Sequence, residues 1–186
     1  MLKPNVYDDK VDQAALNPGA YMFQKMTAWF YLGEIIRIVL LSLVEKNLLF
    51  NGLATDALKK FHGLSSYHSF LIEEAKDLDS IKDIISELLE YSKNAISDQD
   101  AEIVRQVCTI IAARGGRLAG CPIAALLIQQ GLASPGGKNG GSGSKLYMAA
   151  DGECVRSFLP INLFSNQWFT DCLLGLLSLN LVCISL

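Results

Sequence analysis

The strongest constraint on the fold is a helical stretch whose apolar residues surround its axis. From about Ala20 to Phe50, apolar side chains recur every three to four residues, which predicts an α-helix. Between Ile35 and Val44 they cover nearly every side of that helix. Other elements must therefore cover it on most sides. The segment is too short for a membrane span and contains Arg37, so we expect it in the core of a domain.

Gly33 lies inside this helix and needs an explanation. A glycine in a helix interior is about 1 kcal/mol less favourable than alanine. Either close packing of another element or a ligand could require the space that a side chain would fill. The sequence favours close packing and leaves the ligand as the alternative.

Further helices are expected after a turn at Asn51-Gly52. Ser97 with Asp100 forms a capping-box pattern, which predicts the start of another helix. That helix continues into small residues, and Pro122 is expected to restart or kink it. The predicted helical ranges after the turn are 55–60, 66–75, 78–91, about 97–121 and 123–130.

The C-terminal third has a different character. Residues 134–144 are rich in Gly and Ser and predict a flexible loop rather than a phosphate-binding loop, because Lys145 leads into a β-type run instead of a helix. Residues 145–150 predict a short strand. Residues 157–186 form a largely apolar tail, interrupted by Asp171.

Composition argues against several classes of function. The net charge is -3 and the basic residues form no cluster, so we expect no nucleic-acid partner. The five cysteines form no C-x-x-C pair, so we expect no metal site. His62 and His68 are expected in local, non-catalytic roles, and the acidic run from Asp77 to Glu87 is expected to be a solvated surface. Charged residues interrupt the N-terminus, so we expect no signal peptide and a cytoplasmic location.

Several motifs occur together in a fixed order over residues 5–156. They are Tyr7-Asp8-x-x-Val11-Asp12, Asn17-Pro18-Gly19, Tyr31-Leu32-Gly33-Glu34-Ile35-Ile36-Arg37, Asn47-Leu48-Leu49-Phe50, Asp100-x-x-Ile103-Val104-Arg105, Ala112-Ala113-Arg114-Gly115-Gly116-Arg117-Leu118-Ala119 and Ala150-Asp151-Gly152. In order and spacing this set resembles the hexokinase family, in the C-terminal part of its large domain. Within that family the chain looks most like fungal hexokinases or N-acetylglucosamine kinases.

The resemblance implies a fold and an activity. The fold class would be α/β and helix-rich, a fragment of the large domain of an actin-like ATPase, which is ribonuclease H-like. Residues 1–156 would form a partial large domain, with 157–186 as a non-matching tail. Complete relatives use ATP with Mg to phosphorylate the 6-hydroxyl of a hexose in glycolysis.

The resemblance also implies that this chain is truncated. The family's catalytic aspartate precedes the matched segments, so we assign no catalytic residue and expect the chain alone to bind hexose and ATP weakly or not at all. One alternative is a non-catalytic, regulatory member that binds a partner protein. Another is membrane attachment through residues 169–186, which the short apolar run disfavours.

Individual binding positions follow only from the resemblance. Gln24 falls where the family carries a glutamate that accepts hydrogen bonds from sugar hydroxyls, and glucose and N-acetylglucosamine are the candidate sugars. Glu153 replaces a serine near the nucleotide, which places a negative group beside a polyanion. The positions on the nucleotide side are Trp29, Phe30, Ser65, Ser66, Asp151, Gly152 and Glu153.

Overall fold

The computed structural model describes residues 3–131, 146–150 and 181–185. The chain divides into two compact units, Met1–Ala112 and Ala113–Leu186, and each is described by itself. Predicted features in 132–145 and 151–180 lie outside the described residues. They include the loop 134–144 and most of the apolar tail.

The first unit begins with helix α1 (Val6–Ala14), which Asn5 starts with a capping box. Helix α2 (Met22–Thr27) follows, and α3 (Trp29–Glu45) comes directly after it. The prediction of one helix from Ala20 to Phe50 is therefore wrong. Ala28 is extended, at φ -71° and ψ 137°, and separates the two helices.

Helix α3 forms the centre of the core, as its apolar residues predict. Ile35, Ile36, Leu40 and Val44 are almost completely buried. After α3 the chain turns through the short helix η1 (Phe50–Gly52). Three further helices, α4 (Asp56–Lys59), α5 (Ser66–Glu74) and α6 (Leu78–Leu89), lie close to the predicted ranges, and the short helix η2 (Lys93–Ala95) precedes the last one.

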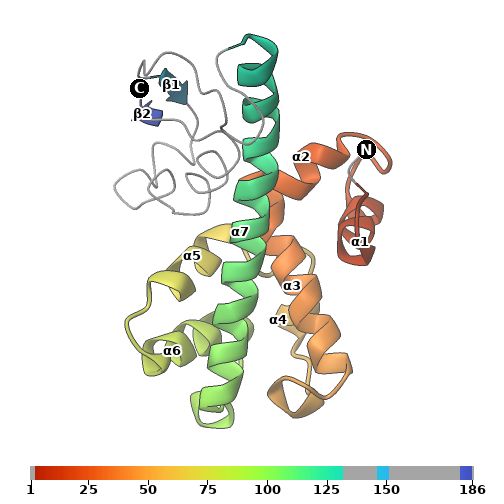
Figure 1. Ribbon diagram of the computed structural model, residues 1–186. Coiled ribbons are helices and arrows are strands. Elements are labelled where there is room, and N and C mark those ends of the chain that lie inside the picture. The colour runs from red at the N-terminus through yellow and green to blue at the C-terminus, as the bar shows by residue number, and fades with distance from the viewer. Residues whose placement is uncertain (1–2, 132–145, 151–180, 186) are drawn as a thin grey trace. The chain divides into compact units, whose positions relative to one another are not determined.

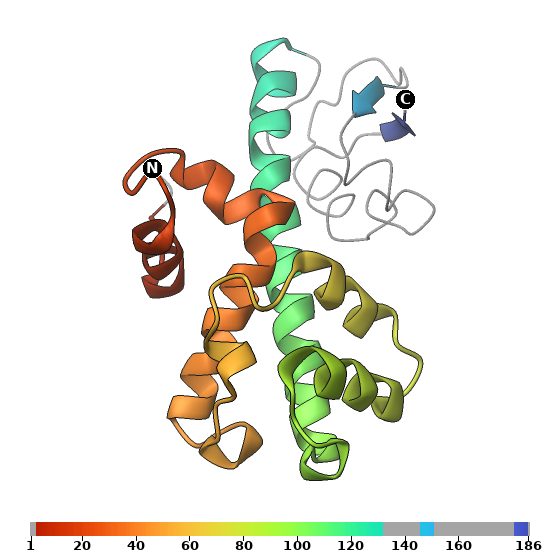
Figure 2. The same ribbon diagram turned by 180° about the vertical axis from the view of Figure 1, so that it is seen from behind.

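The first half of α7 (Asp98–Gln129) completes this core. Figures 1 and 2 show it running between α3–α4 and α5–α6. The predicted capping box is confirmed. The Ser97 amide donates to Asp100 Oδ2 at 3.0 Å, and the Asp100 amide donates to Ser97 Oγ at 3.0 Å. Asp100 Oδ1 also accepts from the Phe50 amide at 2.9 Å, which ties the start of α7 to the turn after α3.

Pro122 does not restart the helix, because α7 continues through it to Gln129, and the alternative of a kink there stays a prediction. By length and composition alone, α7 is the one described helix that could cross a membrane. Ala101, Val104 and Cys108 of α7 lie in the core of the first unit, whereas only 28% of the apolar window that passes this test is buried.

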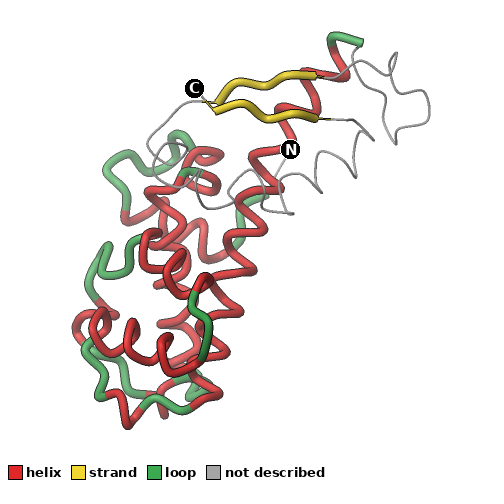
Figure 3. Tube along the Cα trace, turned by 90° about the vertical axis from the view of Figure 1, so that its left-hand side faces the viewer, coloured by secondary structure: helices red, strands yellow, loops and turns green. Residues whose placement is uncertain are grey.

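In the second unit, strand β1 (Leu146–Ala150) confirms the predicted strand. It pairs in parallel with β2 (Leu181–Ser185), with Leu146 opposite Leu181 and Ala150 opposite Ser185. Figure 3 shows the two strands side by side. The second strand was not predicted from the apolar tail.

Candidate functional site

Two of the predicted nucleotide-side segments meet where α3 and α5 begin. The Gly33 amide donates to Ser66 Oγ at 2.8 Å, and Ser66 Oγ donates to the carbonyl of Trp29. An α-helix would join the Gly33 amide and the Trp29 carbonyl directly, since they are four residues apart. The Ser66 hydroxyl thus contacts both members of that backbone pair, across 37 residues of sequence. Ser66 itself is 3% exposed.

Gly33 makes this approach possible. A Cβ on Gly33 would lie 2.5 Å from the Leu64 carbonyl oxygen and 2.5 Å from the Ser66 amide nitrogen. These are backbone atoms, and Leu64 is fully buried, so they cannot move aside easily. The preferred explanation of Gly33, close packing of another element, is therefore confirmed.

Ser65 lies at the exposed start of α5. As N-cap residue it makes no side-chain cap to the helix. Its Oγ instead lies 2.8 Å from His68 Nδ1. Burial lowers the pKa of His68, against a smaller opposing effect of Glu87, so the imidazole is neutral at neutral pH. The start of a helix carries partial positive charge and suits an anion.

Trp29 and Phe30 are the first two residues of α3. Trp29 is half-buried, whereas Phe30 is 65% exposed. The Phe30 ring packs against His62 at 4.6 Å between ring centroids, and Phe61 packs against the same imidazole at 4.1 Å. The predicted local role of His62 is thus aromatic packing.

Two buried charged residues of α3 were not identified as site residues by the sequence analysis. Glu34 is fully buried and forms a two-bond pair with Arg37, at 2.8 Å from Nε and 2.5 Å from Nη2. Charged residues in the middle of an apolar stretch were the signal that could have identified them, because burial of a charge requires a partner.

Gln24, the predicted sugar contact, is exposed on α2. Its neighbour Lys25 is buried and donates to Asp12 Oδ1 at 2.6 Å and to the Asn17 carbonyl at 2.5 Å. Asp12 Oδ2 accepts from the Gly19 amide at 2.8 Å. The hydrogen bond from Lys25, with that from Gly19, lowers the pKa of Asp12. This pair fixes the turn that leads into α2.

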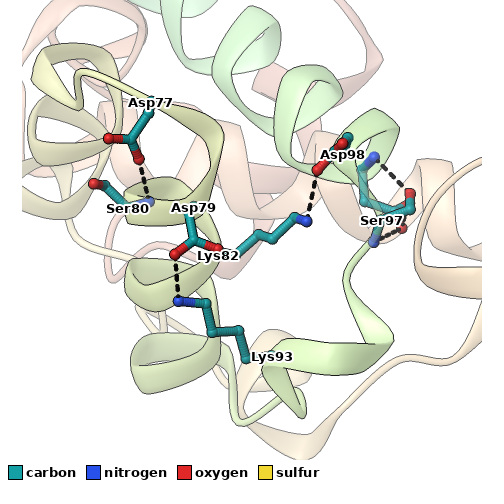
Figure 4. A network of polar contacts seen from close by, with 8 residues as sticks. Asp77, Asp79, Ser80, Lys82, Lys93, Ser97 and Asp98 are labelled. Atoms are coloured by element: carbon teal, nitrogen blue, oxygen red, sulfur yellow. Dashed lines mark hydrogen bonds and ion pairs between the residues drawn. The ribbon is translucent and has the colours of Figure 1, made fainter.

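The acidic surface of α6 is confirmed as solvated. Asp77, Asp79, Asp83 and Glu87 are exposed. Asp77 caps α6 through the Ser80 amide at 2.8 Å, and Lys93 pairs with Asp79 at 2.9 Å (Figure 4). No cluster of three or more potential metal ligands occurs in the part of the chain that the structure describes.

One acid differs from this surface. Glu73 of α5 is largely buried, and burial, with the nearby Glu74, raises its pKa to about 7. The predicted positions Asp151, Gly152 and Glu153 lie outside the described residues. Of the predicted positions, the structure joins Trp29 directly to Ser66, with Phe30 and Ser65 as their neighbours in the chain, and leaves Gln24 on the preceding helix.

The fold of the chain is similar to that of solved hexokinases. A hexokinase of Schistosoma mansoni, solved in complex with glucose, superposes with a TM-score of 0.77 at 22% identity, covering 98% of this chain and 38% of that one. The fold is that of a helix-rich fragment of the large domain of an actin-like ATPase, as predicted.

The hexokinase family model matches residues 2–175. The chain is 31% identical to the Hexokinase-like 1 protein of Arabidopsis thaliana over 95% of its own length and 34% of the relative's. It is 33% identical to Hexokinase-1 of Nicotiana tabacum, over 78% of its own length and 29% of that protein's. The chain belongs to the hexokinase family.

The chain spans about a third of the length of these plant relatives. The family match continues past the predicted boundary at residue 156, up to 175. The division into 1–156 and 157–186 stays a prediction, as does the resemblance to fungal members in particular.

Proposed function

We propose that this chain supplies the nucleotide side of the large domain in a hexokinase-type phosphotransferase, one that transfers the γ-phosphate of ATP to the 6-hydroxyl of a hexose. The observation that carries the proposal is the contact of Ser66 with Trp29 and Gly33. It joins two segments that the family resemblance assigns to the nucleotide, and it fixes the start of α5 on α3.

The chemistry at the start of α5 suits a phosphate. Ser65 presents an exposed hydroxyl there, which bonds His68 instead of capping the helix and could exchange that partner for a phosphate oxygen. Backbone amides at the start of a helix, together with a serine hydroxyl, form a suitable environment for phosphate oxygens. Because Ser66 is held on α3, the start of α5 is already ordered before the nucleotide binds, and binding does not have to offset the entropy of ordering it.

The same proposal includes a limit on this chain. Phosphoryl transfer requires a positioned sugar hydroxyl, a base that accepts its proton and Mg²⁺ on the nucleotide. None of the residues assigned here has the role of that base. We propose that the 186 residues alone bind ATP weakly, and a sugar through Gln24 more weakly, in the cytoplasm, without phosphorylating it.

An alternative is a regulatory family member without activity. Phe30 and Phe61 are large and exposed, at 65% and 45%, and both rings pack against His62. Exposed apolar residues that gather on one surface are typical of a protein interface. In that case the start of α5 would bind no phosphate, and a partner protein would cover these rings.

The test is an assay of glucose and N-acetylglucosamine phosphorylation with the purified chain, alongside titration with MgATP followed by ligand-observed NMR. We expect weak ATP binding that Ser65→Ala reduces, and no sugar phosphate. Mass analysis of the products distinguishes a sugar phosphate from a phosphorylated buffer molecule. Sugar phosphate formed by the chain, free of host kinase, would contradict the proposed limit, and absence of ATP binding would favour the regulatory alternative.

A further inference from the structure

Glu34 and Arg37 are the two charged side chains in the buried part of α3. Glu34 is fully buried and Arg37 is 6% exposed. Burial of two charges is unfavourable unless geometry and additional hydrogen bonds compensate for the lost water. What else these side chains contact therefore indicates what the pair does.

The pair holds the end of α4 and the backbone just after it. Arg37 Nη1 donates to the Leu58 carbonyl at 2.8 Å and to the Lys59 carbonyl at 3.3 Å. Glu34 Oε2, which already accepts from Arg37 Nε, also accepts from the His62 amide at 2.9 Å. Two carbonyls and one amide of residues 58–62 are thus fixed on α3.

This backbone leads directly to the segment that the proposed function assigns to phosphate. Only Gly63 and Leu64 separate His62 from Ser65. Neither position leaves room for movement: Leu64 is fully buried, and a Cβ on Gly63 would lie 2.2 Å from the Ala57 carbonyl oxygen. On the other side of the segment, Gly33 contacts Ser66 and is next to Glu34 in α3.

We propose that Glu34 and Arg37 are positioning residues for the Ser65–Ser66 segment, and that nucleotide affinity depends on them although neither touches the nucleotide. The inference rests on the proposed function. Arginine is needed for its planar fork, which reaches the carboxylate through two nitrogens and the carbonyls through a third. Lysine keeps the charge and cannot make this set of bonds.

The main test is MgATP affinity of Arg37→Lys. Loss of the charge-assisted hydrogen bonds from Arg37 to the Leu58 and Lys59 carbonyls should release the Ser65–Ser66 segment and weaken ATP binding about tenfold or more. The matched control is Arg105→Lys, because Arg105 pairs with Glu102 at the same three-residue spacing on α7 but is partly exposed. The control should leave ATP affinity within about twofold. Equal affinity of Arg37→Lys and the unmutated chain would overturn the proposal.

A double-mutant cycle separates positioning from general stability. Ser66→Ala should weaken ATP binding in the unmutated chain and have little further effect in Arg37→Lys, because both changes release the same segment. Additive losses would overturn the proposal. Glu34→Gln keeps the side-chain shape and one acceptor oxygen, and should give the same coupling if Arg37→Lys does not fold.

Amide hydrogen exchange tests the positioning without ATP. In the unmutated chain, the Gly33 and His62 amides should open together as one cooperative unit. In Arg37→Lys both should exchange at least tenfold faster, while amides of α6 keep their rates. Independent opening of Gly33 and His62 would overturn the proposal. A chain that shows this exchange pattern and binds no ATP would instead contradict the proposed function and leave the positioning role intact.

Discussion

Gly33→Ala is expected to destabilise the protein, although alanine is the better helix former. Alanine in a helix interior favours the folded state by about 1 kcal/mol relative to glycine. Against this gain, the new Cβ would meet the Leu64 carbonyl oxygen and the Ser66 amide nitrogen at 2.5 Å each, and the Ser65 carbonyl carbon at 2.6 Å. Forcing extra volume into a packed contact typically costs about 1–3 kcal/mol.

The displacement would also break two hydrogen bonds. The Gly33 amide would lose Ser66 Oγ, and the Trp29 carbonyl would lose the Ser66 hydroxyl. Each such bond contributes about 0.5–1.5 kcal/mol. The balance is a loss of about 3 kcal/mol in the free energy of unfolding, with a range of about 1–5. For a chain of this length it lowers Tm by about 6–12 °C.

The assay is urea unfolding of Gly33→Ala beside Gly116→Ala. Gly116 lies in α7, and a Cβ there would meet nothing within 4 Å. Its replacement by alanine should stabilise the protein by about 0.5–1 kcal/mol through helix propensity alone. If Gly33→Ala were neutral or stabilising to a similar extent, the close contact between α3 and the start of α5 would be refuted.

Three further predictions concern other contacts of the first unit. Asp100→Ala should cost about 2–4 kcal/mol by urea unfolding, because the capping box loses the bond from the Ser97 amide and the buried Phe50 amide loses its acceptor. Asp98→Ala, at the exposed end of an ion pair with Lys82, should cost less than about 1 kcal/mol. Because Lys25 lowers the pKa of Asp12, the ionised carboxylate stabilises the fold above its ordinary pKa, and this stabilisation is lost as the pH falls through the pKa of the folded state. Asp12→Asn should therefore flatten the loss of stability below about pH 4. An unchanged acid profile would contradict the pairing. For Glu73 the pH dependence of stability has the opposite sign. Its pKa is raised to about 7, so the free energy of unfolding falls as the pH rises from about 4.3 to 7. Glu73→Gln should remove up to about 2 kcal/mol of that fall, and an unchanged pH profile would show that the side chain is solvated.

Much of the fold follows from local sequence signals. Apolar residues surround α3 between Ile35 and Val44, and the structure buries them completely or in part. The Ser97–Asp100 pattern and the strand over 146–150 were also recognisable, because capping and strand propensity depend on neighbouring residues.

The break at Ala28 could not be predicted locally. Alanine is the best helix former, so nothing in the sequence ends the helix there. The Trp29 carbonyl, next to the break, accepts from Ser66, which is 37 residues away. A contact over that separation leaves no periodic signal. The apolar residues of β2 were ambiguous for a related reason, since a short apolar run fits a buried strand and a buried helix equally well.

The candidate site was predictable only through the family resemblance. Ser65 and Ser66 carry no motif of their own. The sequence explains Gly33 by close packing but does not show that the start of α5 is the element that packs there. Glu34 and Arg37 were visible as charges in an apolar helix, but their function depends on backbone groups of residues 58–62. Three-dimensional placement was needed to connect them.

The central claim is that the nucleotide side of the site is the contact between α3 and the start of α5. Its most direct test is the change in backbone amide chemical shifts on titration with MgATP, using the full chain and adenosine as the control without phosphate. We predict the largest changes at Ser65, Ser66 and Gly33, and none of comparable size there with adenosine. The claim would be contradicted if ATP shifted amides elsewhere and left these three unchanged.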